Sequence, residues 1–441
     1  MSDRGFPFRD LINPVISPII ARCHPDARSR IFPPETVVFT YISGALSGDK
    51  SLKSAVIRNN AERALQGLAP SSLGTSSLSD ARHGLDTDVL REATRGYAST
   101  TQSQFEESVF WEGLTPYAID GSTVTANDTP ENQARFPQHA NQSEGAGFPL
   151  IRMLLLQSLR SGMVADFAFD AFKGKETGEM ALARRVMGNI GENDLLLGDR
   201  YFPSYFIMAD LVARGAHGVF QSHAARGVDF RRGRSLGKRD HVVEWIRPQR
   251  PSWMKIEEYE AYPPSLNLRE ADVTHESRQP TAFVIVTTLI DSEKYSKRKL
   301  AKFYRKRWNI ELALRDLKTT FHMDHIAANT PEMVEKGFWG HLLAYNMLRW
   351  HMLNAATLCE VPIENVSVKT AATIMMQNSA LIMQCTEETK AHTFAVVYFQ
   401  MTQVPVGKRP DRKEPRAVKR RPKARERLNE SRSAWQQRRK T

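Results

Sequence analysis

Hydrophobic and polar positions follow different periods in successive parts of the chain, and each period predicts a different kind of region. From the N-terminus to about residue 105, apolar residues recur at helical spacing. Between about 114 and 216, short apolar runs alternate with helical patterns, which is typical of α/β folds. A strand-rich stretch with Arg/Gly turns occupies 217–290, and helical periodicity then returns up to about residue 402.

The N-terminal region is predicted to be helical and carries no cluster of chemically reactive side chains. Candidate helices cover residues 36–47, 50–66, 78–84 and 87–104. Ser77 and Ser79, in the turn-rich segment PSSLGTSSLSD, are candidate caps for the helix that follows. Two interpretations stay open for this region: a small domain that docks on DNA, and a helical scaffold packed on the next domain.

The central region reads as strands and helices in alternation. TPYAID (115–120) is predicted to be a strand that ends at Asp120, and a polar loop then extends to residue 147. The remaining elements are a hairpin, a helix, a strand and a helix, at residues 149–159 with 162–172, 177–190, 194–199 and 203–215. Further along, one long helix is predicted to contain residues 304–318, and another spans 330–357.

Two aspartates share one sequence context, because each is predicted to end an apolar strand of about five residues. Asp120 closes TPYAID, and Asp199 closes DLLLGD. For one such aspartate alone, a role in a turn or a helix cap is the commoner outcome. In an open sheet, however, functional groups collect at the carboxyl ends of strands. The pair therefore favours a set of oxygen ligands, which hard divalent cations such as Mg²⁺ require.

The stretch YRKRWNIELALRDLK supplies a third carboxylate. Tyr304, Arg307, Glu311 and Lys318 stand at offsets of 0, 3, 7 and 14, which an α-helix gathers within an arc of roughly 60°. A solvated charged face is the alternative, but apolar residues on the adjoining side indicate a packed helix with its polar face directed at something. With Glu311 beside the two aspartates, the cluster would suit two metal ions and phosphodiester chemistry.

The net charge of +12 is concentrated at the C-terminus. Residues 408–441 hold 15 Lys/Arg and 4 Asp/Glu, a net charge of +11, so the preceding 407 residues are nearly neutral at +1. Such an arm favours binding to a polyanion, most plainly nucleic acid; a solubilising tail is the alternative.

Other features of the sequence indicate where in the cell the protein is expected. No apolar run approaches the roughly 18 residues that a membrane helix needs, and the first residues lack a signal-peptide pattern, so no membrane partner is expected. Cys23, Cys359 and Cys385 have neither disulfide nor metal-ligand spacing. A reducing, cytoplasmic location follows as an expectation.

In these motifs the chain resembles the DDE transposases of bacterial insertion sequences, in the insertion-sequence-four family. The family signature Tyr-x2-Arg-x3-Glu-x6-Lys (YREK) is present without deviation in the stretch 304–318. The family's first motif, an apolar strand ending in Asp-Gly-[Ser/Thr], matches AIDGS at Asp120, and its second motif, [Gly/Ala]-Asp-Arg after a strand, matches LLLGDRYF at Asp199. Similar segments are DTPEN (128–132), GKRDH (237–241), TPEMV (330–334) and HLLAYNMLR (341–349). The resemblance runs from about residue 115 to 350.

The resemblance implies an α/β fold with a ribonuclease-H-like core, interrupted between Asp199 and Glu311 by a mostly β insertion. The strand-rich stretch predicted from the residues themselves falls in the same 112-residue interval. Helical N-terminal and C-terminal regions flank this core. The expected boundaries are 1–105 for the helical N-terminal domain, a candidate for DNA binding; 106–216 for the first part of the core; 217–290 for the insertion; 291–360 for the second part of the core; 361–407 for a helical C-terminal region; and 408–441 for a basic, disordered tail.

The resemblance also implies roles for individual residues. Asp120, Asp199 and Glu311 would be the catalytic residues and would hold two Mg²⁺ ions, for which Mn²⁺ can substitute. Water, and later the freed 3′-hydroxyl, would attack phosphodiesters at the transposon end and in the target DNA. The cationic and phenolic members of the signature, Tyr304, Arg307 and Lys318, would contact DNA phosphates, since Arg offers a planar fork, Lys a point charge and Tyr a hydroxyl donor.

Three further residues are candidates for contacts with DNA, and for each of them another role stays open. Arg200, beside Asp199, either contacts phosphate or pairs with a carboxylate. Family members often cut the second strand through a DNA hairpin, with a flipped base stacked on a tryptophan of the insertion. Trp245 and Trp253 are the candidates for base stacking, and ordinary packing is the alternative for both.

The expected function is therefore a transposase that binds terminal inverted repeats, cleaves the ends and joins them to target DNA in a cut-and-paste reaction. Pairing two ends implies a homodimer on DNA, within the bacterial nucleoid. Two alternatives stay open: a metal-dependent nuclease without strand transfer, and a transposase-derived DNA-binding protein that is no longer catalytic. A glycosidase with paired carboxylates is disfavoured by the basic tail and the Arg/Lys helix face.

Overall fold

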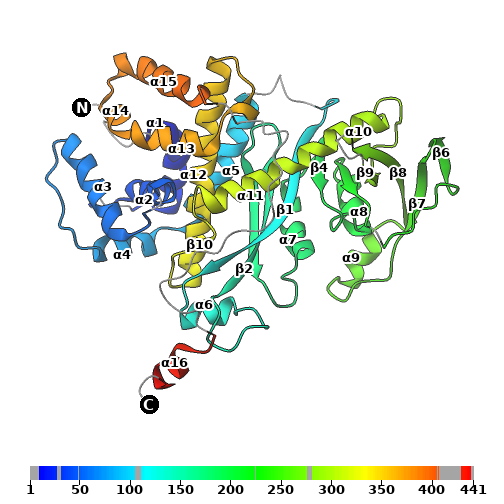
Figure 1. Ribbon diagram of the computed structural model, residues 1–441, viewed down its shortest axis with the longest axis horizontal. Helices are drawn as coiled ribbons and strands as arrows, with labels where there is room; N and C mark the ends of the chain where they lie inside the picture. Colours follow the sequence, from blue (N-terminus) through cyan, green and yellow to red (C-terminus); the bar gives the residue numbers. More distant parts are fainter. Residues whose placement is uncertain are drawn as a thin grey trace.

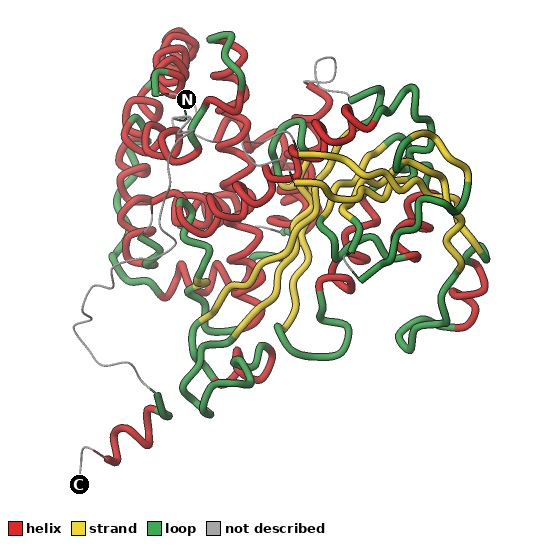
Figure 2. The backbone as a smooth tube through the Cα atoms, turned by 45° about the vertical axis from the view of Figure 1, so that its right-hand side comes forward, coloured by secondary structure: helices red, strands yellow, loops and turns green. Residues whose placement is uncertain are grey.

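Ten strands form one continuous mixed sheet, and the helices are arranged around it (Figure 1). The computed structural model describes residues 9–26, 31–47, 49–104, 111–223, 225–275, 281–404, 406 and 429–438. A lobe of helices lies at one end of the sheet, and a strand-rich extension lies at the other (Figures 1 and 2). The predicted α/β class is confirmed by this arrangement.

The first half of the sheet is built from the predicted central region. Its elements are β1 (Thr115–Ala126), α6 (Pro130–Arg135), β2 (Leu150–Ser158), β3 (Val164–Ala171), α7 (Glu179–Val186), the 3₁₀ turn η2 (Met187–Asn189), β4 (Asp194–Gly198), α8 (Tyr205–Ala213) and β5 (His217–Gln221). Strands β3, β2 and β1 are antiparallel neighbours, whereas β1, β4 and β5 are parallel. The predicted hairpin, helix, strand and helix are all present.

The strand-rich extension continues the same sheet. It consists of β6 (Arg234–Gly237), β7 (Asp240–Ile246), α9 (Ile256–Ala261), β8 (Ser265–His275) and β9 (Thr281–Thr287). Strand β9 pairs antiparallel with β5, so the sheet order is β3-β2-β1-β4-β5-β9-β8-β7-β6, with β10 paired to β1. The predicted β-rich segment is confirmed, with one short helix inside it.

Strand β1 is longer than predicted. It runs through Asp120 to Ala126, because GSTVTA continues to pair with β2 and its last two residues pair with β10 (His325–Ile326). Thr and Val favour extended backbone, and the turn expected after Asp120 does not form. Only Asp199 directly follows the end of its strand.

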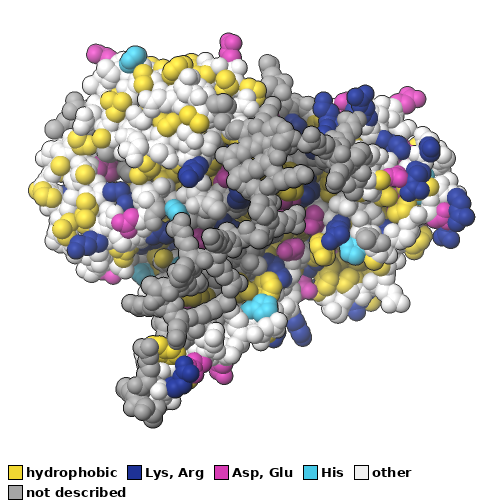
Figure 3. Space-filling view, viewed as in Figure 1, with side chains coloured by type: hydrophobic (Ala, Val, Ile, Leu, Met, Phe, Trp, Pro, Cys, Tyr) yellow, Lys and Arg dark blue, Asp and Glu magenta, His cyan; other side chains and the backbone are white. Residues whose placement is uncertain are grey.

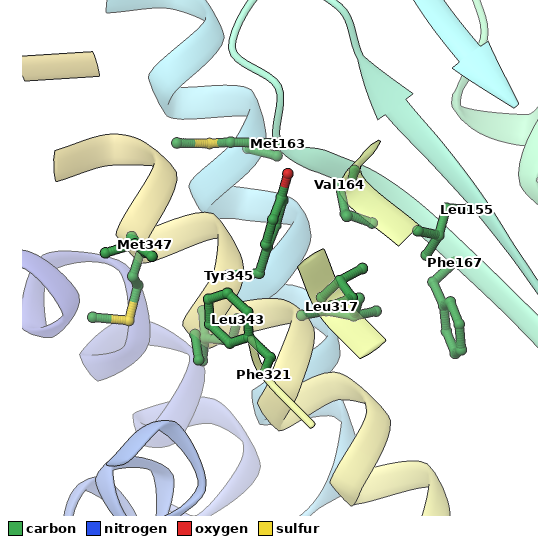
Figure 4. Packing of buried hydrophobic residues seen from close by; sticks show 14 of the residues in the cluster. Leu155, Met163, Val164, Phe167, Leu317, Phe321, Leu343, Tyr345 and Met347 are labelled. Atoms are coloured by element: carbon green, nitrogen blue, oxygen red, sulfur yellow. The ribbon is translucent and has the colours of Figure 1, made fainter. Parts of the chain in front are cut away.

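Helices cover both faces of the sheet with separate apolar clusters. On one face, α7 and α8 bury Leu182 and Phe206 against Ile119 and Leu154. The other face packs against α5 (Thr87–Gln104), α11 (Trp308–Thr319) and α12 (Pro331–Leu358). Figure 4 shows this second cluster, where Leu317 of α11 lies among Leu155, Phe167 and side chains of α12.

Helix α12 is the central helix of the molecule. It packs against α5, α2 (Pro34–Ser47) and α15 (Glu387–Thr402). The side chain of Asn346, fully buried, accepts from Val164 N at 2.8 Å and donates to Thr94 O at 3.1 Å. One amide therefore joins α12 to β3 and α5, which explains a polar residue inside the apolar run HLLAYNMLR.

The N-terminal helices are those expected, with one more before them. They are α1 (Arg9–Cys23), α2, α3 (Leu52–Leu65), α4 (Ser76–Gly84) and α5. Because α2 and α5 pack on α12, this part of the lobe is a scaffold; a DNA-binding role stays a prediction. The candidate cap Ser77 lies inside α4, which Thr75 precedes without a side-chain cap bond.

The C-terminal region is helical up to Thr402, as predicted. It contains η4 (Ile363–Asn365), α13 (Val368–Gln377), α14 (Ser379–Gln384) and α15. Most of the basic tail lies outside the described residues; within it, the described stretch 429–438 contains α16 (Arg432–Arg438). No helix in the described ranges is long and apolar enough to cross a membrane.

The stretch 304–318 is not a single α-helix. It is divided among α10 (Lys297–Tyr304), the 3₁₀ turn η3 (Arg305–Arg307) and α11. A 3₁₀ turn has 3.0 residues per turn, so it changes the direction in which the residues before it point. Tyr304 is thereby turned inward, with only 7% of its surface exposed.

A buried ion pair joins the extension to the chain that leads into α10. The guanidinium of Arg269 donates to both carboxylate oxygens of Asp240, at 2.8 and 2.6 Å, and also to Tyr295 O at 2.7 Å. Arg269 is fully buried and Asp240 is 4% exposed. The aspartate of GKRDH therefore has a structural role, because it balances the charge of this arginine.

Replacing Arg269 by Met should lower the free energy of unfolding by about 3–5 kcal/mol, since Asp240 would stay buried without its cation. Chemical denaturation followed by circular dichroism measures the loss. The control is the double variant Arg269→Met/Asp240→Leu, which leaves no unpaired charge and should lose clearly less. Equal losses in the two variants would contradict the importance of the pair.

Candidate active site

The two aspartates are brought together by the pairing of β1 with β4. These strands are parallel, and their printed register ends at Ala118 opposite Leu197. Asp120 lies two residues beyond Ala118 in β1, Asp199 lies two residues beyond Leu197 and directly follows β4, and the charge of Asp199 acts on Asp120. The sequence pattern predicts a shared site for the two aspartates, and Asp120 lies inside its strand instead of at its end.

The backbone beneath Asp199 is tightly packed. A side chain at Gly198 would place a Cβ atom 2.9 Å from Phe202 and Phe220 and 3.0 Å from Ile119. A side chain immediately before Asp199 would therefore force these neighbours to shift. The hydroxyl of Tyr304 donates to Gly198 O at 3.0 Å, which fixes the same residue from the side of α10.

Asp199 also stabilises its own turn. Its Oδ1 accepts the backbone N–H of Tyr201 at 2.8 Å, and its carbonyl accepts from Phe202 N at 3.3 Å. The role in a turn that a lone aspartate would have is thus present as well. It leaves the second carboxylate oxygen of Asp199 outside this turn bond.

Helix α11 carries Glu311 to the same place. It packs against β1 and buries Ile310, Leu314 and Leu317, which leaves Glu311 half-buried on the side of the aspartates. Arg307 Nη2 donates to Glu311 Oε1 at 2.6 Å. The signature arginine and glutamate therefore form an ion pair one helical turn apart.

Asp120 has the strongest electrostatic response in this group. Burial raises the pKa of Asp120 from 3.8 to about 6; the Gly121 N–H and Arg307 oppose the rise, whereas Asp199 and Glu311 add to it. Asp199 and Glu311 thus both lie within electrostatic reach of Asp120. A bound cation would offset the repulsion between these carboxylates.

The donor chemistry fits a hard divalent cation. All three side chains are carboxylates, and oxygen is the ligand type that Mg²⁺ prefers. Within the described ranges, no three His, Cys, Asp or Glu side chains are close enough together to hold an ion as they stand. Glu311 is engaged with Arg307, so its carboxylate would have to turn from that ion pair to act as a ligand.

The other signature residues are in different environments. Tyr304 is buried, and burial raises its pKa to about 12; its hydroxyl is bound to Gly198 O. Lys318 is half-buried near the end of α11, where burial lowers its pKa and Asp324 partly offsets this effect. Arg200 is exposed, and its guanidinium lies 5.9 Å from the centre of the Tyr201 ring.

The two candidate tryptophans are packed inside the extension. Trp245 is 3% exposed, donates to Glu270 Oε1 at 3.0 Å and has the Arg226 guanidinium 3.2 Å from its ring centre. Trp253 is half-buried, with the Arg184 guanidinium 3.7 Å from its ring centre. Among the described contacts, neither tryptophan touches Asp120, Asp199 or Glu311. An arginine covers the ring of each tryptophan.

Reasoning from the sequence missed Trp308, Tyr201 and Glu179. Trp308 and Tyr201 are aromatic residues with 57% and 59% of their surface exposed, directly after Arg307 and two residues after Asp199. The signal for Trp308 was available, because a large apolar residue stands within the polar signature itself.

Glu179 is a fourth carboxylate beside the cluster. A Cβ atom at Gly121 would lie 2.8 Å from its Cδ and Oε1, so the glycine of AIDGS leaves space for this side chain. Burial raises the pKa of Glu179; Arg152 opposes the rise and Asp199 adds to it. Only the packing of α7 on the sheet reveals this residue, since it lies 58 positions after Gly121.

Comparison with known proteins identifies the central part of the chain. The family described as "Transposase DDE domain" matches residues 111–347. Transposase InsG for insertion sequence element IS4, from Escherichia coli strain K12, is 29% identical over 350 residues, which are 77% of this chain and 75% of the relative. The transposase for insertion sequence element IS421, from Escherichia coli, is 35% identical over 81 residues, 18% of this chain and 22% of that protein.

Among solved structures, the cryo-EM structure of the piggyBac transposase synaptic complex with hairpin DNA is similar to this chain. It covers 92% of this chain and 86% of its own, with a TM-score of 0.40 and 10% identity.

Replacing Asp120 by Asn should stabilise the metal-free protein above pH 6. A carboxyl whose pKa is raised by folding destabilises the folded state wherever it is ionised, and this cost disappears below about pH 3, where it is protonated in both states. We expect a gain of about 1–2 kcal/mol at pH 8 and almost none at about pH 3. Urea unfolding in EDTA across this range measures it, and an Asn variant less stable at pH 8 would contradict the electrostatic account.

Proposed function

We propose that this chain, which belongs to the transposase DDE-domain family, is a cut-and-paste transposase of an insertion sequence. It binds the terminal inverted repeats of its element, cleaves the ends by hydrolysis of phosphodiesters and joins the 3′ ends to target DNA. The observation that carries the proposal is the register of β1 and β4, which sets Asp120 beside Asp199 within electrostatic reach of Glu311.

The catalytic core is proposed to be ribonuclease-H-like. The support is the strand order β3-β2-β1-β4-β5, in which β2 is antiparallel to β1 while β1, β4 and β5 are parallel. In this arrangement the extension is an insertion between β5 and α10 that shares the sheet with the core. The second part of the core then returns with α11 and α12.

Asp120, Asp199 and Glu311 are the proposed ligands of two Mg²⁺ ions, with Mn²⁺ as a substitute. When bound, the ions supply the activation of the attacking oxygen and the stabilisation of the leaving oxygen. Arg307 acts as the counter-charge of Glu311 while no substrate is present, because their ion pair measures 2.6 Å. When Glu311 turns to its ligand role, the guanidinium becomes available to a DNA phosphate.

The remaining signature residues have separate proposed tasks. Lys318 and Arg200 contact phosphates, for which the exposure of Arg200 is favourable. Tyr304 contributes through its hydroxyl, which either holds Gly198, as here, or is exchanged for a phosphate contact. Two protomers are required to pair two ends, so the active form on chromosomal DNA is proposed to be a homodimer.

Base stacking beside the cut is proposed for Trp308 in addition to the two tryptophans of the extension. The rings of Trp245 and Trp253 are covered by Arg226 and Arg184, so a base would first have to displace an arginine. The Trp308 ring is 57% exposed and adjoins Arg307. An unstacked base at the cut therefore has a free aromatic surface within the signature.

Replacing Glu311 by Gln should lower DNA cleavage at least about 1,000-fold, because a metal ligand contributes several kcal/mol to the transition state. Binding to the terminal-repeat duplex should change little. The assay uses a duplex carrying the element's end, a supercoiled target and Mg²⁺, and it scores cleaved and joined products separately.

The matched control is Asp316→Asn, which neutralises another carboxylate of α11 that pairs with Arg315 instead. It should retain cleavage. Full cleavage by Glu311→Gln would overturn the assignment, whereas cleavage without joined products in the unmodified protein would indicate a nuclease.

Replacing Trp308 by Ala should lower end cleavage by about 5- to 150-fold, the equivalent of the 1–3 kcal/mol that stacking one base contributes. Trp308→Phe should keep most of the activity, since it retains an aromatic face. A 2-aminopurine at the cleavage position reports the unstacked base by its fluorescence. An unchanged rate in Trp308→Ala, with a loss in Trp253→Ala, would assign the stacking to the extension.

A further inference from the structure

A basic groove lies between helix α10 and strand β8, outside the carboxylate cluster. Its volume is about 740 Å³. From β8 it is lined by Asp272, Val273 and Thr274, and from α10 and its flanks by Ser296, Lys297, Arg298, Lys299, Ala301, Lys302 and Arg305. The wall that α10 supplies is therefore almost entirely cationic.

The charge balance of the groove is strongly positive. Five of the ten lining residues are Lys or Arg, and one, Asp272, is acidic. That carboxylate is already neutralised, because it forms an ion pair with Arg239. Figure 3 shows Lys and Arg side chains gathered over α10 and the β6–β8 end of the extension. A groove lined by positive charge attracts a polyanion.

Two of the cations are free to bind a ligand. Lys302 and Arg305 are exposed, and neither has an ion pair or a side-chain hydrogen bond among the described residues. Lys297 and Lys299 are partly engaged, since Lys297 Nζ donates to Lys238 O at 2.8 Å and Lys299 Nζ lies 2.9 Å from Glu112 Oε1. The binding strength of the groove therefore rests mainly on Lys302 and Arg305.

The cations form a line along the helix. Arg298 and Lys302 are four residues apart and lie on one face of α10, and Arg305 follows as the first residue of η3. Seven residues of helix rise about 10.5 Å, which corresponds to about three phosphates of one DNA strand. The spacing suits the backbone of a nucleic acid rather than a single small anion.

The lining suits contacts with the phosphate backbone. Lys, Arg, Ser and Thr of the groove can all contact phosphate, and the lining contains no Asn, Gln or aromatic residue. A duplex held through its phosphates is bound without regard to its sequence. Within a transposition reaction, that property suits DNA outside the element, whose sequence varies from site to site.

Along the chain, the groove is followed by the helix that carries Glu311. Arg305 is the first residue of η3, which connects α10 to α11, and Glu311 follows six residues later. The far end of α11 lies toward the helical lobe, where Lys50 Nζ donates to His325 O at 3.2 Å (Figure 1). A duplex with its scissile phosphate at Glu311 therefore has the groove on one side and the lobe on the other.

We propose that the groove between α10 and β8 binds the phosphate backbone of the DNA that flanks the element, on the side of the scissile phosphate away from the helical lobe. The inference rests on the proposed function for the identity of the duplex. Lys302 and Arg305 are the two residues that hold this DNA most strongly.

The test measures how DNA affinity depends on salt, in EDTA so that no cleavage occurs. The double variant Lys302→Gln/Arg305→Gln is compared with the unmodified protein and with the control Lys175→Gln/Arg214→Gln, which removes two exposed cations elsewhere. Two duplexes are used: a terminal repeat extended by 20 base pairs of flank, and the same repeat ending at the cleavage position. Thermal unfolding verifies that all three proteins are folded.

On the flanked duplex, the double variant should bind at least about 10-fold more weakly between 0.1 and 0.2 M salt, and the slope of log K against log salt should decrease by about 2 in magnitude. On the duplex without flank, it should match the unmodified protein. An unchanged slope on the flanked duplex, an equal decrease on both duplexes or the same decrease in the control would each overturn the inference. Failure of the unmodified protein to prefer its own terminal repeat would instead contradict the proposed function.

Discussion

The parallel pairing of β1 with β4 is the constraint on which the candidate site depends. The two aspartates are 79 residues apart, and only the register of these strands sets them side by side. The register is held by residues that cannot easily change. Gly198 has no space for a side chain, and β1 is paired on its other side with β2 along nine residues of both strands. Sliding by one residue would turn Asp120 to the opposite face.

The third carboxylate depends on the extension as much as on the core. Because β9 pairs with β5, the extension is part of the same sheet, and Arg269 then ties β8 to the backbone at Tyr295, just before α10. From there α10, η3 and α11 form one path to Glu311. Leu317 anchors the other end of that path in the apolar cluster with α12. Because this path is held by packing at both ends, Glu311 stays close to strands β1 and β4.

The grouped carboxylates of the candidate site lower the stability of the protein when no cation is bound. Three carboxylates in electrostatic contact, with a fourth at Glu179, are balanced by few cations, and burial keeps the pKa of Asp120 near 6. Arg307 reduces the imbalance by pairing with Glu311. Such an arrangement costs free energy in the protein alone and is relieved when cations arrive, which is a common property of sites built for charged ligands.

The local sequence determined the class of fold, most of the elements and the chemical character of the site. Periodicity and turn residues are local signals, so the hairpin, α8, α12 and the strand-rich extension could be recognised from them. The motifs AIDGS, LLLGDRYF and the YREK stretch identified the family, which the matching residues 111–347 confirm. The extent of β1 was misjudged, because the strand beyond Asp120 exists only through its pairing with β2 and β10.

Tertiary structure decided what each functional group contacts. The inward turn of Tyr304 follows from the 3₁₀ segment η3, which the periodicity of the stretch does not reveal. The arginines over Trp245 and Trp253, the exposure of Trp308 and the position of Glu179 beside Gly121 are contacts between residues distant in sequence or results of packing. The sequence by itself therefore determined which groups are available for the proposed phosphodiester chemistry. Packing of the sheet and helices decided which of these groups meet, because burial and long-range contacts depend on the whole fold.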